Sequence, residues 1–276
     1  MTNYLTNKWS YFLIAICAIL VLALACEKDP TEPDVEGPDI PPISTFLMDF
    51  STFPDTAATL AKPSSTLTYE NWILARFTTL FWNVVILAHA AIPVAAYAES
   101  FQHTPEQQED GSWVWSYSVD VGDSTYTAEL HASTDADGIN WEMYLSLVDG
   151  YTDFLWFTGQ HNLLYTEGTW RLYKDPDDPV EFVDIEWHRS LANSTADIKY
   201  TNIEVGTDGY SGFIFYGITE ETPYDAFYDI FNAAEDRNTD IEWNLETYAG
   251  HIRDETHYED TLWHCWDETL NDVDCE

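Results

Sequence analysis

Hydrophobic and polar side chains alternate along most of the chain between residues 111 and 266. In the first of these runs Trp113, Trp115 and Tyr117 fall on one side of an extended backbone, whereas Ser116 and Ser118 fall on the other. A period of two residues is typical of a β-strand with one buried face. Clusters of turn-forming residues separate the runs, at residues 121–123, 135–138, 149–150, 175–179 and 207–209. The pattern predicts an antiparallel meander of roughly nine to eleven strands joined by short turns.

A sheet of this many strands is not expected to stay flat and open, because the right-handed twist of its strands accumulates across it. We therefore expect a mainly β domain in which the meander curls into a barrel or half-barrel. Two weak internal matches favour a meander built from similar hairpins. They pair residues 111–113 with 168–170, and residues 185–187 with 241–243.

Residues 69–100 follow a different pattern, because apolar side chains cover every side of the helix that they would form. No charged residue occurs between Arg76 and Glu99, Thr68 is a suitable N-cap, and Pro93 would kink or end the helix. A helix that is apolar all round lies in the core of a large domain or in a membrane. We predict that it packs against the concave face of the sheet.

The tryptophans expected to contact this helix are Trp113, Trp115, Trp141 and Trp187. A second membrane span is the alternative for the helix, although Asn83, His89 and Pro93 would interrupt it. Before the helix, residues 45–53 alternate loosely and predict an edge strand. Residues 45–276 are thus expected to form a single β-rich domain.

The first 25 residues have the order of a signal peptide. A short polar segment with one cation precedes 17 uncharged residues that end in small side chains. The next residue is a cysteine, Cys26. This arrangement predicts export across a membrane.

The stretch LALAC at residues 22–26 resembles the lipobox of bacterial lipoproteins. Ala25 stands at the small position before the cysteine, and Ala23 stands where leucine is commoner. The resemblance implies that residues 1–25 are cleaved off and that the thiol of Cys26 carries a diacylglycerol. The lipid would anchor the chain to a membrane. An uncleaved N-terminal helix is the alternative.

Residues 26–44 are rich in proline and acidic side chains and contain few core-forming residues. Such a segment stays extended and solvated, so we expect a tether between the lipid and the domain. Its early acidic residues, Glu27 and Asp29, resemble the surface-export signals of lipoproteins in some Gram-negative phyla. We therefore expect anchoring to the bacterial outer membrane, at the cell surface or on the periplasmic face.

The chain has four cysteines, of which Cys17 leaves with the signal peptide and Cys26 receives the lipid. Cys265 and Cys275 remain as an even pair in an oxidising compartment. We predict a disulfide between them that fixes the C-terminal end of the chain.

Acidic side chains outnumber basic ones by 49 to 10, which gives a formal net charge of −39. A field of this sign repels nucleic acid, so we expect no nucleic-acid partner, whereas divalent cations are suitable partners. The acidic residues between Cys265 and Cys275 could bind calcium, although they lack the glycine and the ligand order of an EF-hand loop. His251, His257 and His264 follow neither a helix period nor a strand period, and we assign no metal ligand.

The chain contains no phosphate-binding loop, GxSxG elbow, HExxH motif or dinucleotide fingerprint. We therefore expect no enzyme and assign no catalytic or cofactor-binding residue. The first functional class is a binding or carrier protein whose curved sheet and apolar helix enclose a hydrophobic small molecule. Its shape resembles the half-barrel of lipoprotein carriers with a helix lid. The alternative is a structural or adhesive surface protein with a solid core, whose acidic exterior meets cations or a protein partner.

Overall fold

The computed structural model describes residues 36–53 and 68–275, and for residues 83–89 it describes the backbone alone. The predicted signal peptide, Cys26 and most of the predicted tether lie outside the described residues. The chain divides into two compact units, Met1–Gly37 and Pro38–Glu276, and the second unit holds every element named below. Among the described residues, no helix combines the length and the apolar character needed to cross a membrane.

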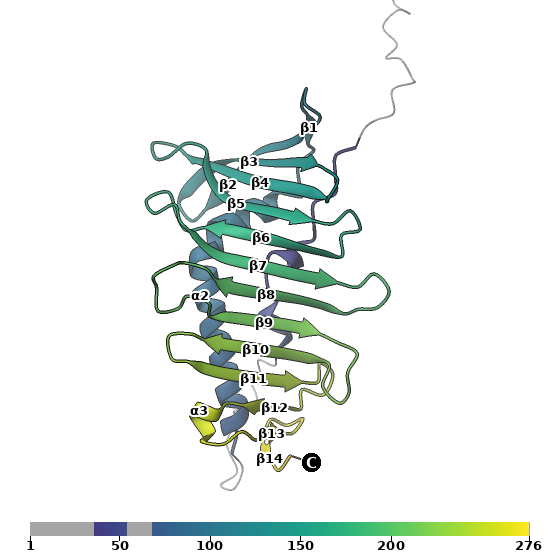
Figure 1. The fold of residues 1–276 in the computed structure, drawn as a ribbon, viewed down its shortest axis with the longest axis vertical. Helices are drawn as coiled ribbons and strands as arrows, with labels where there is room; N and C mark the ends of the chain where they lie inside the picture. Colours follow the sequence, from purple (N-terminus) through teal and green to yellow (C-terminus); the bar gives the residue numbers. More distant parts are fainter. Residues whose placement is uncertain (1–35, 54–67, 276) are drawn as a thin grey trace, which may run out of the picture. The chain divides into compact units, whose positions relative to one another are not determined.

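In the described part of the chain, fourteen strands form one antiparallel sheet in which each strand pairs with its neighbours in sequence (Figure 1). The strands are β1 (Glu106–Gln107), β2 (Trp113–Val121), β3 (Ser124–Thr134), β4 (Ile139–Leu147), β5 (Phe154–His161), β6 (Glu167–Tyr173), β7 (Glu181–Arg189), β8 (Ala196–Asn202), β9 (Phe213–Ile218), β10 (Ala226–Asn232), β11 (Arg237–Trp243), β12 (Gly250–Arg253), β13 (His264–Trp266) and β14 (Asp272–Val273). Buried and exposed residues alternate along strands such as β3. The predicted antiparallel meander is therefore confirmed.

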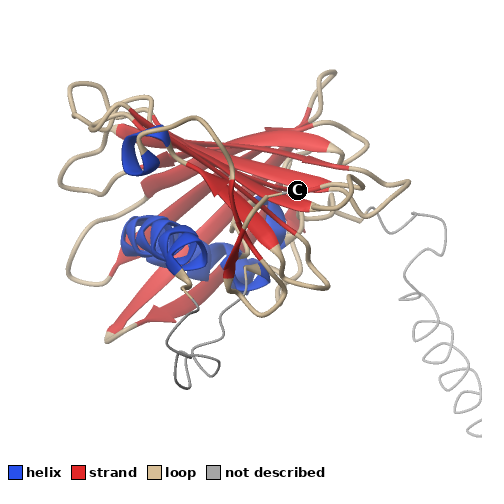
Figure 2. Cartoon of the chain, turned by 90° about the horizontal axis from the view of Figure 1, so that it is seen from below, coloured by secondary structure: helices blue, strands red, loops and turns tan. Residues whose placement is uncertain are grey.

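The sheet is neither closed nor strongly curled, so the predicted barrel or half-barrel is wrong (Figure 2). Its two edge strands, β1 and β14, lie at opposite ends of the strand order. The helix α2 (Glu70–Ser100) crosses the sheet on one face, which we call the inner face. Its 31 residues give a length of about 46 Å, close to the roughly 53 Å from β2 to β13 at a strand spacing of 4.8 Å. Because a long helix covers the inner face, the sheet need not close to bury it.

The N-terminus of α2 is capped by a carboxylate from the far end of the chain. Asp272 in β14 accepts hydrogen bonds from the backbone N–H groups of Glu70 and Asn71, each at 3.0 Å. Its negative charge also lies at the positive end of the helix dipole, which stabilises the helix. Tyr69 occupies the N-cap position and makes no side-chain capping bond, so the N-cap predicted at Thr68 is wrong.

The helix continues through Pro93 and packs most closely against the two ends of the sheet. Its nearest strands are β2 and β3 at one end and β12, β13 and β14 at the other. β2 carries Trp113 and Trp115, two of the four tryptophans expected beside the helix. Trp170 of β6, which was not among them, contacts Tyr97 of α2, with ring centroids 5.2 Å apart.

A segment before the helix, residues 38–53, also lies against the inner face. It contains two short 3₁₀ helices, η1 (Ile43–Thr45) and η2 (Phe50–Thr52). The edge strand predicted for this part of the chain is therefore wrong. One local cause is Asp49, whose carboxylate accepts a hydrogen bond from the N–H of Ser51 at 2.9 Å and begins η2.

Side chains of the sheet hold this segment by hydrogen bonds to its backbone. The hydroxyl of Tyr200 donates to the carbonyl of Phe46 at 2.7 Å and accepts from the N–H of Met48 at 3.0 Å. The indole N–H of Trp243 donates to the carbonyl of Thr52 at 3.3 Å. Phe46 and Met48 are buried. The segment thus belongs to the core, beside α2.

Glycines on the inner face make room for the aromatic rings of neighbouring strands. A Cβ at Gly159 would overlap the ring of Trp170, and a Cβ at Gly250 would overlap the ring of Trp266. Each glycine lies directly opposite its tryptophan in the strand register. This pairing of the smallest residue with the largest lets the inner layer reach the density of a protein core.

The predicted disulfide is confirmed. Cys265 in β13 is bonded to Cys275, and their Cα atoms lie 5.3 Å apart. The bond ties the end of the chain to the last strands of the sheet, next to the carboxylate that caps α2.

Replacing Tyr200 by phenylalanine should lower the free energy of unfolding by about 2–3 kcal/mol, because two buried backbone groups lose their partner. Urea denaturation measures the change. The matched control is Tyr228→Phe, which removes a buried hydroxyl that makes no hydrogen bond of normal geometry. The control should lose less than about 1 kcal/mol. Equal losses in the two variants would mean that the segment is not held by Tyr200.

Asp272→Ala should destabilise the domain by about 1–2 kcal/mol, the usual cost of removing a helix cap. Asp274→Ala removes the same charge two residues away, from an exposed side chain, and should stay within about 0.5 kcal/mol of the wild type. Thermal and urea unfolding of both variants test the long-range cap. Equal stability of the two variants, within experimental error, would refute the cap.

Candidate functional site

Three hairpin connections of the meander come together beside α2 and enclose a cleft of about 440 Å³. They join β6 to β7, β8 to β9 and β10 to β11 (Figure 1). Every second turn of a meander lies at the same ends of the strands, so these three connections are neighbours. The described lining residues are Phe81, Trp82 and Ala90 of α2, Leu172, Lys174, Phe182 and Val183 of the β6–β7 hairpin, Tyr200, Thr201, Asn202, Glu204, Gly209 and Gly212 of the β8–β9 hairpin, and Asn232, Ala233, Ala234 and Glu235.

The floor of the cleft is apolar. Leu172, Phe182 and Tyr200 are buried residues of β6, β7 and β8, and Ala90 contributes a buried position of the helix. Burial raises the pKa of the Tyr200 hydroxyl, which stays protonated and bonded to the 38–53 segment. The floor therefore consists of hydrocarbon and aromatic surface with its polar atom already engaged.

Exposed aromatic surface continues from the cleft onto the helix. Phe81 lines the cleft with 59% of its surface exposed, and Phe77, one turn earlier, is 67% exposed. The ring of Phe81 packs edge-on against Trp82, with centroids 6.2 Å apart. Exposed apolar surface of this kind is a candidate place for a ligand or partner to bind.

The rim of the cleft is polar and carries a compensated cation. Lys174 Nζ lies 2.8 Å from a carboxylate oxygen of Glu204 and 3.1 Å from one of Asp178. The hydrogen bond to Glu204, followed by the weaker effect of the one to Asp178, raises the pKa of Lys174. Glu235 adds a further negative charge to the lining. The described rim thus presents no net positive charge and disfavours an anionic head group.

A larger hollow of about 810 Å³ lies on the opposite, outer face of the sheet, over β3 to β7. Most of its lining residues are polar, among them His131, Glu142, Thr158, Gln160, Thr169, Arg171, Asp184 and Glu186, and Trp141 and Trp170 also line it. Arg171 is held by Asp184 through Nε at 2.7 Å and Nη2 at 2.9 Å. Because this hollow lacks a continuous apolar lining, a hydrophobic ligand fits the cleft beside α2 better.

Two of the three histidines considered as metal ligands are paired with different carboxylates. His251 lies 2.9 Å from Glu242 and His264 lies 3.1 Å from Asp260, whereas His257 is exposed. Two of the acidic residues considered for calcium are also engaged, since Asp267 accepts hydrogen bonds from the backbone N–H groups of its own turn and Asp272 caps α2. In residues 36–53 and 68–275, no group of three or more His, Cys, Asp or Glu side chains is arranged to hold a metal ion.

The sequence identified none of the cleft residues as site residues. Cys26, its lipidation site, lies outside the described residues, and its disulfide pair lies at the other end of the sheet from β2. One signal was available in principle: Phe81 and Trp82 are large aromatic residues in a helix with no polar face. Which of them reaches solvent depends on where the sheet lies, and this is not written in the helix pattern.

Comparison of the chain with protein-family models, with curated proteins and with solved structures yields no match.

Proposed function

We propose that this protein is an exported, membrane-anchored lipoprotein that binds a hydrophobic small molecule without catalysis. The observation that carries the proposal is the cleft of about 440 Å³ beside α2. Its volume lies within the range of small-molecule sites, and it combines an apolar floor with a few polar groups at the rim, as such sites do.

The energetics favour an apolar ligand at this position. Filling the cleft would remove the exposed ring of Phe81 from water, which contributes roughly 1.5–3 kcal/mol for a side chain of this size. The rim charges of Lys174, Asp178 and Glu204 already satisfy one another. The ligand head group that suits them is uncharged and capable of hydrogen bonding, for example a hydroxyl or an amide.

The N-terminal export sequence is consistent with this role. The lipobox-like residues 22–26 and the acidic, proline-rich residues that follow support a lipid anchor at Cys26 on the outer membrane. A tether of this kind would keep a binding domain at the membrane surface, where hydrophobic molecules are concentrated. A structural or adhesive role remains the second proposal, and the acidic outer hollow favours it.

The binding proposal is tested with a lipid-free chain of residues 27–276 and the uncharged fluorophore N-phenyl-1-naphthylamine. We expect saturable binding to the wild type, weakened at least tenfold by Phe81→Asp, because a carboxylate then lies in the apolar cleft. Phe77→Asp is the matched control: it adds the same charge one turn away, on an exposed side chain outside the described lining. It should bind within about twofold of the wild type.

Unfolding curves of the two variants should coincide, which separates loss of the site from loss of the fold. If the fluorophore binds neither the wild type nor either variant, the cleft is not a ligand site and the structural or adhesive role gains. If both variants lose binding equally, the site is elsewhere on the helix.

The anchor is tested independently by Cys26→Ser. The variant should accumulate as an unprocessed precursor and take up no radiolabelled palmitate, because the serine hydroxyl cannot replace the thiol. Cys17→Ser is the matched control and should be processed and labelled normally. Normal labelling of the Cys26 variant would refute the lipobox interpretation.

A further inference from the structure

One end of the sheet is closed and the other is open. At the β14 end, the disulfide, the bond from the Asp272 N–H to the carbonyl of Thr68 and the carboxylate cap on α2 use the last residues of the chain. At the β1 end, the edge strand has two residues and pairs only with Trp113 and Val114 of β2. On the side away from β3, the rest of β2 therefore has no strand beside it among the described residues.

The hairpin geometry identifies which backbone groups of β2 face this open edge. Gly122 has φ +61°, as the first central residue of a type II′ turn requires, and Val121 pairs with Ser124 across this two-residue turn. The two residues that flank such a turn form a hydrogen-bonded pair. Hydrogen-bonded and non-bonded pairs then alternate along the ladder. The N–H and C=O groups that point away from β3 belong to Ser116, Ser118 and Asp120.

These three residues are exposed, and in the described part of the chain β3 is the one strand that pairs with them. The side chains between them, Trp115, Tyr117 and Val119, are buried on the inner face. β2 pairs with β3 through all nine of its residues without a bulge. It is therefore a regular strand, and in residues 36–53 and 68–275 no strand pairs with its outward row of donors and acceptors beyond Val114.

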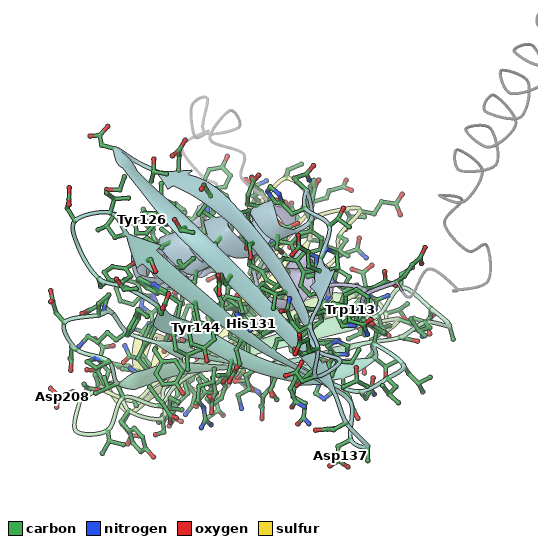
Figure 3. All side chains as sticks on the ribbon, turned by 90° about the horizontal axis from the view of Figure 1, so that it is seen from above. Trp113, Tyr126, His131, Asp137, Tyr144 and Asp208 are labelled. Carbon is green, nitrogen blue, oxygen red and sulfur yellow. A yellow bond between two sulfur atoms is a disulfide. The ribbon has the colours of Figure 1, made fainter. Side chains whose placement is uncertain are left out.

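Soluble proteins usually protect such an edge with lysine, proline or a bulge, or by covering it. The open part of β2 contains no lysine, no proline and one charged residue, Asp120. The neighbouring end of α2 packs on the inner face, where Tyr117 donates to the carbonyl of Ala96 at 2.6 Å and stacks on His103. Figure 3 looks onto this end of the sheet, where Trp113 and Tyr126 mark opposite ends of the β2–β3 hairpin.

The negative charge around the open edge of β2 favours a cationic partner. Between Arg76 and Arg171 the chain contains thirteen Asp and Glu residues and not one Lys or Arg. The stretch between these two arginines includes all of β1 to β5. Four of its acidic residues lie on or beside the β2–β3 hairpin: Glu106, Asp120, Asp123 and Glu129. A second copy would bring two such ends together and be repelled, whereas a cationic strand would be attracted.

We propose that the open edge of β2 is a docking site for an extended cationic peptide segment of another protein, which adds a strand to the sheet. The segment pairs with Ser116, Ser118 and Asp120 through its backbone. Its cationic side chains lie on the acidic outer face, and its intervening apolar side chains lie on the inner face, in line with Trp115, Tyr117 and Val119 of β2. The site is independent of the cleft beside α2.

Two isomeric peptides test the proposal against the mature protein in nonionic detergent. Both peptides have the sequence acetyl-Lys-Val-Lys-Val-Lys-Val-Lys-amide. In one peptide the backbone nitrogens of the three valines are methylated, and in the other those of the last three lysines are methylated. In an added antiparallel strand, the orientation that the proposal takes, the lysine N–H groups face β2, because directly opposite residues share a face and exchange both hydrogen bonds. The valine-methylated peptide should bind by isothermal titration calorimetry, with weaker binding at higher salt. The lysine-methylated peptide, with the same charge and composition, should bind at least tenfold more weakly.

The protein side is tested by Ser118→Pro, which removes one outward N–H and leaves the ladder to β3 intact, since edge positions tolerate proline. Binding of the valine-methylated peptide should fall at least tenfold. Ser118→Thr, the matched control, keeps the N–H and should bind within about twofold. Unfolding curves are compared for both variants, and if the proline variant fails to fold, the peptide pair alone decides.

Three outcomes overturn the proposal. Equal binding of the two peptides would mean attraction by charge alone. A wild-type dimer in sedimentation that Ser118→Pro abolishes would make a second copy the occupant. Slow hydrogen exchange at the amides of Ser116 and Ser118 in a free monomer would mean that another part of this chain already covers the edge.

Discussion

Removal of the aromatic inner face from water is the constraint on which the rest of this structure depends. The largest fully buried side chains of the sheet are on this face, among them Trp141, Trp170, Trp187, Trp243 and Trp266. Each buries far more apolar surface than an aliphatic residue, so leaving the face open would cost more than the margin of stability of a domain. The chain meets this constraint with two covering elements, α2 and residues 38–53, instead of with closure of the sheet.

This solution creates the features that carry the functional proposals. The helix packs most closely at the two ends of the twisted sheet, against β2–β3 and β12–β14. Between these ends the 38–53 segment fills part of the inner face, and the cleft lies where the helix meets three hairpin turns. An open sheet also keeps two edges, of which the chain closes one by the disulfide and Asp272. The cleft and the free edge of β2 are thus products of the same open architecture.

Sequence reasoning succeeded where the information is local and failed where it depends on distant partners. The alternation in β3 and β4 and the glycine turn at Gly122 follow from the side chains of a few consecutive residues. The prediction of a strand at residues 45–53 was wrong. Asp49 begins a 3₁₀ helix there, and Tyr200, about 150 residues later, binds the backbone of Phe46 and Met48 between the two 3₁₀ helices. The helix cap was misplaced for the same reason, since Asp272 lies two hundred residues from the helix that it caps.

By itself the sequence determined the meander, the long apolar helix and the pairing of Cys265 with Cys275, because period, propensity and cysteine number are properties of single segments. It also carries the lipobox-like address at residues 22–26. Only the tertiary structure decided that the sheet stays open, that Phe81 lies at a cleft and that Ser116, Ser118 and Asp120 face a free edge. A hydrophobic pattern states which side of an element must be covered. It does not state what covers it, because that depends on the length of the helix and the twist of the sheet over their full extent.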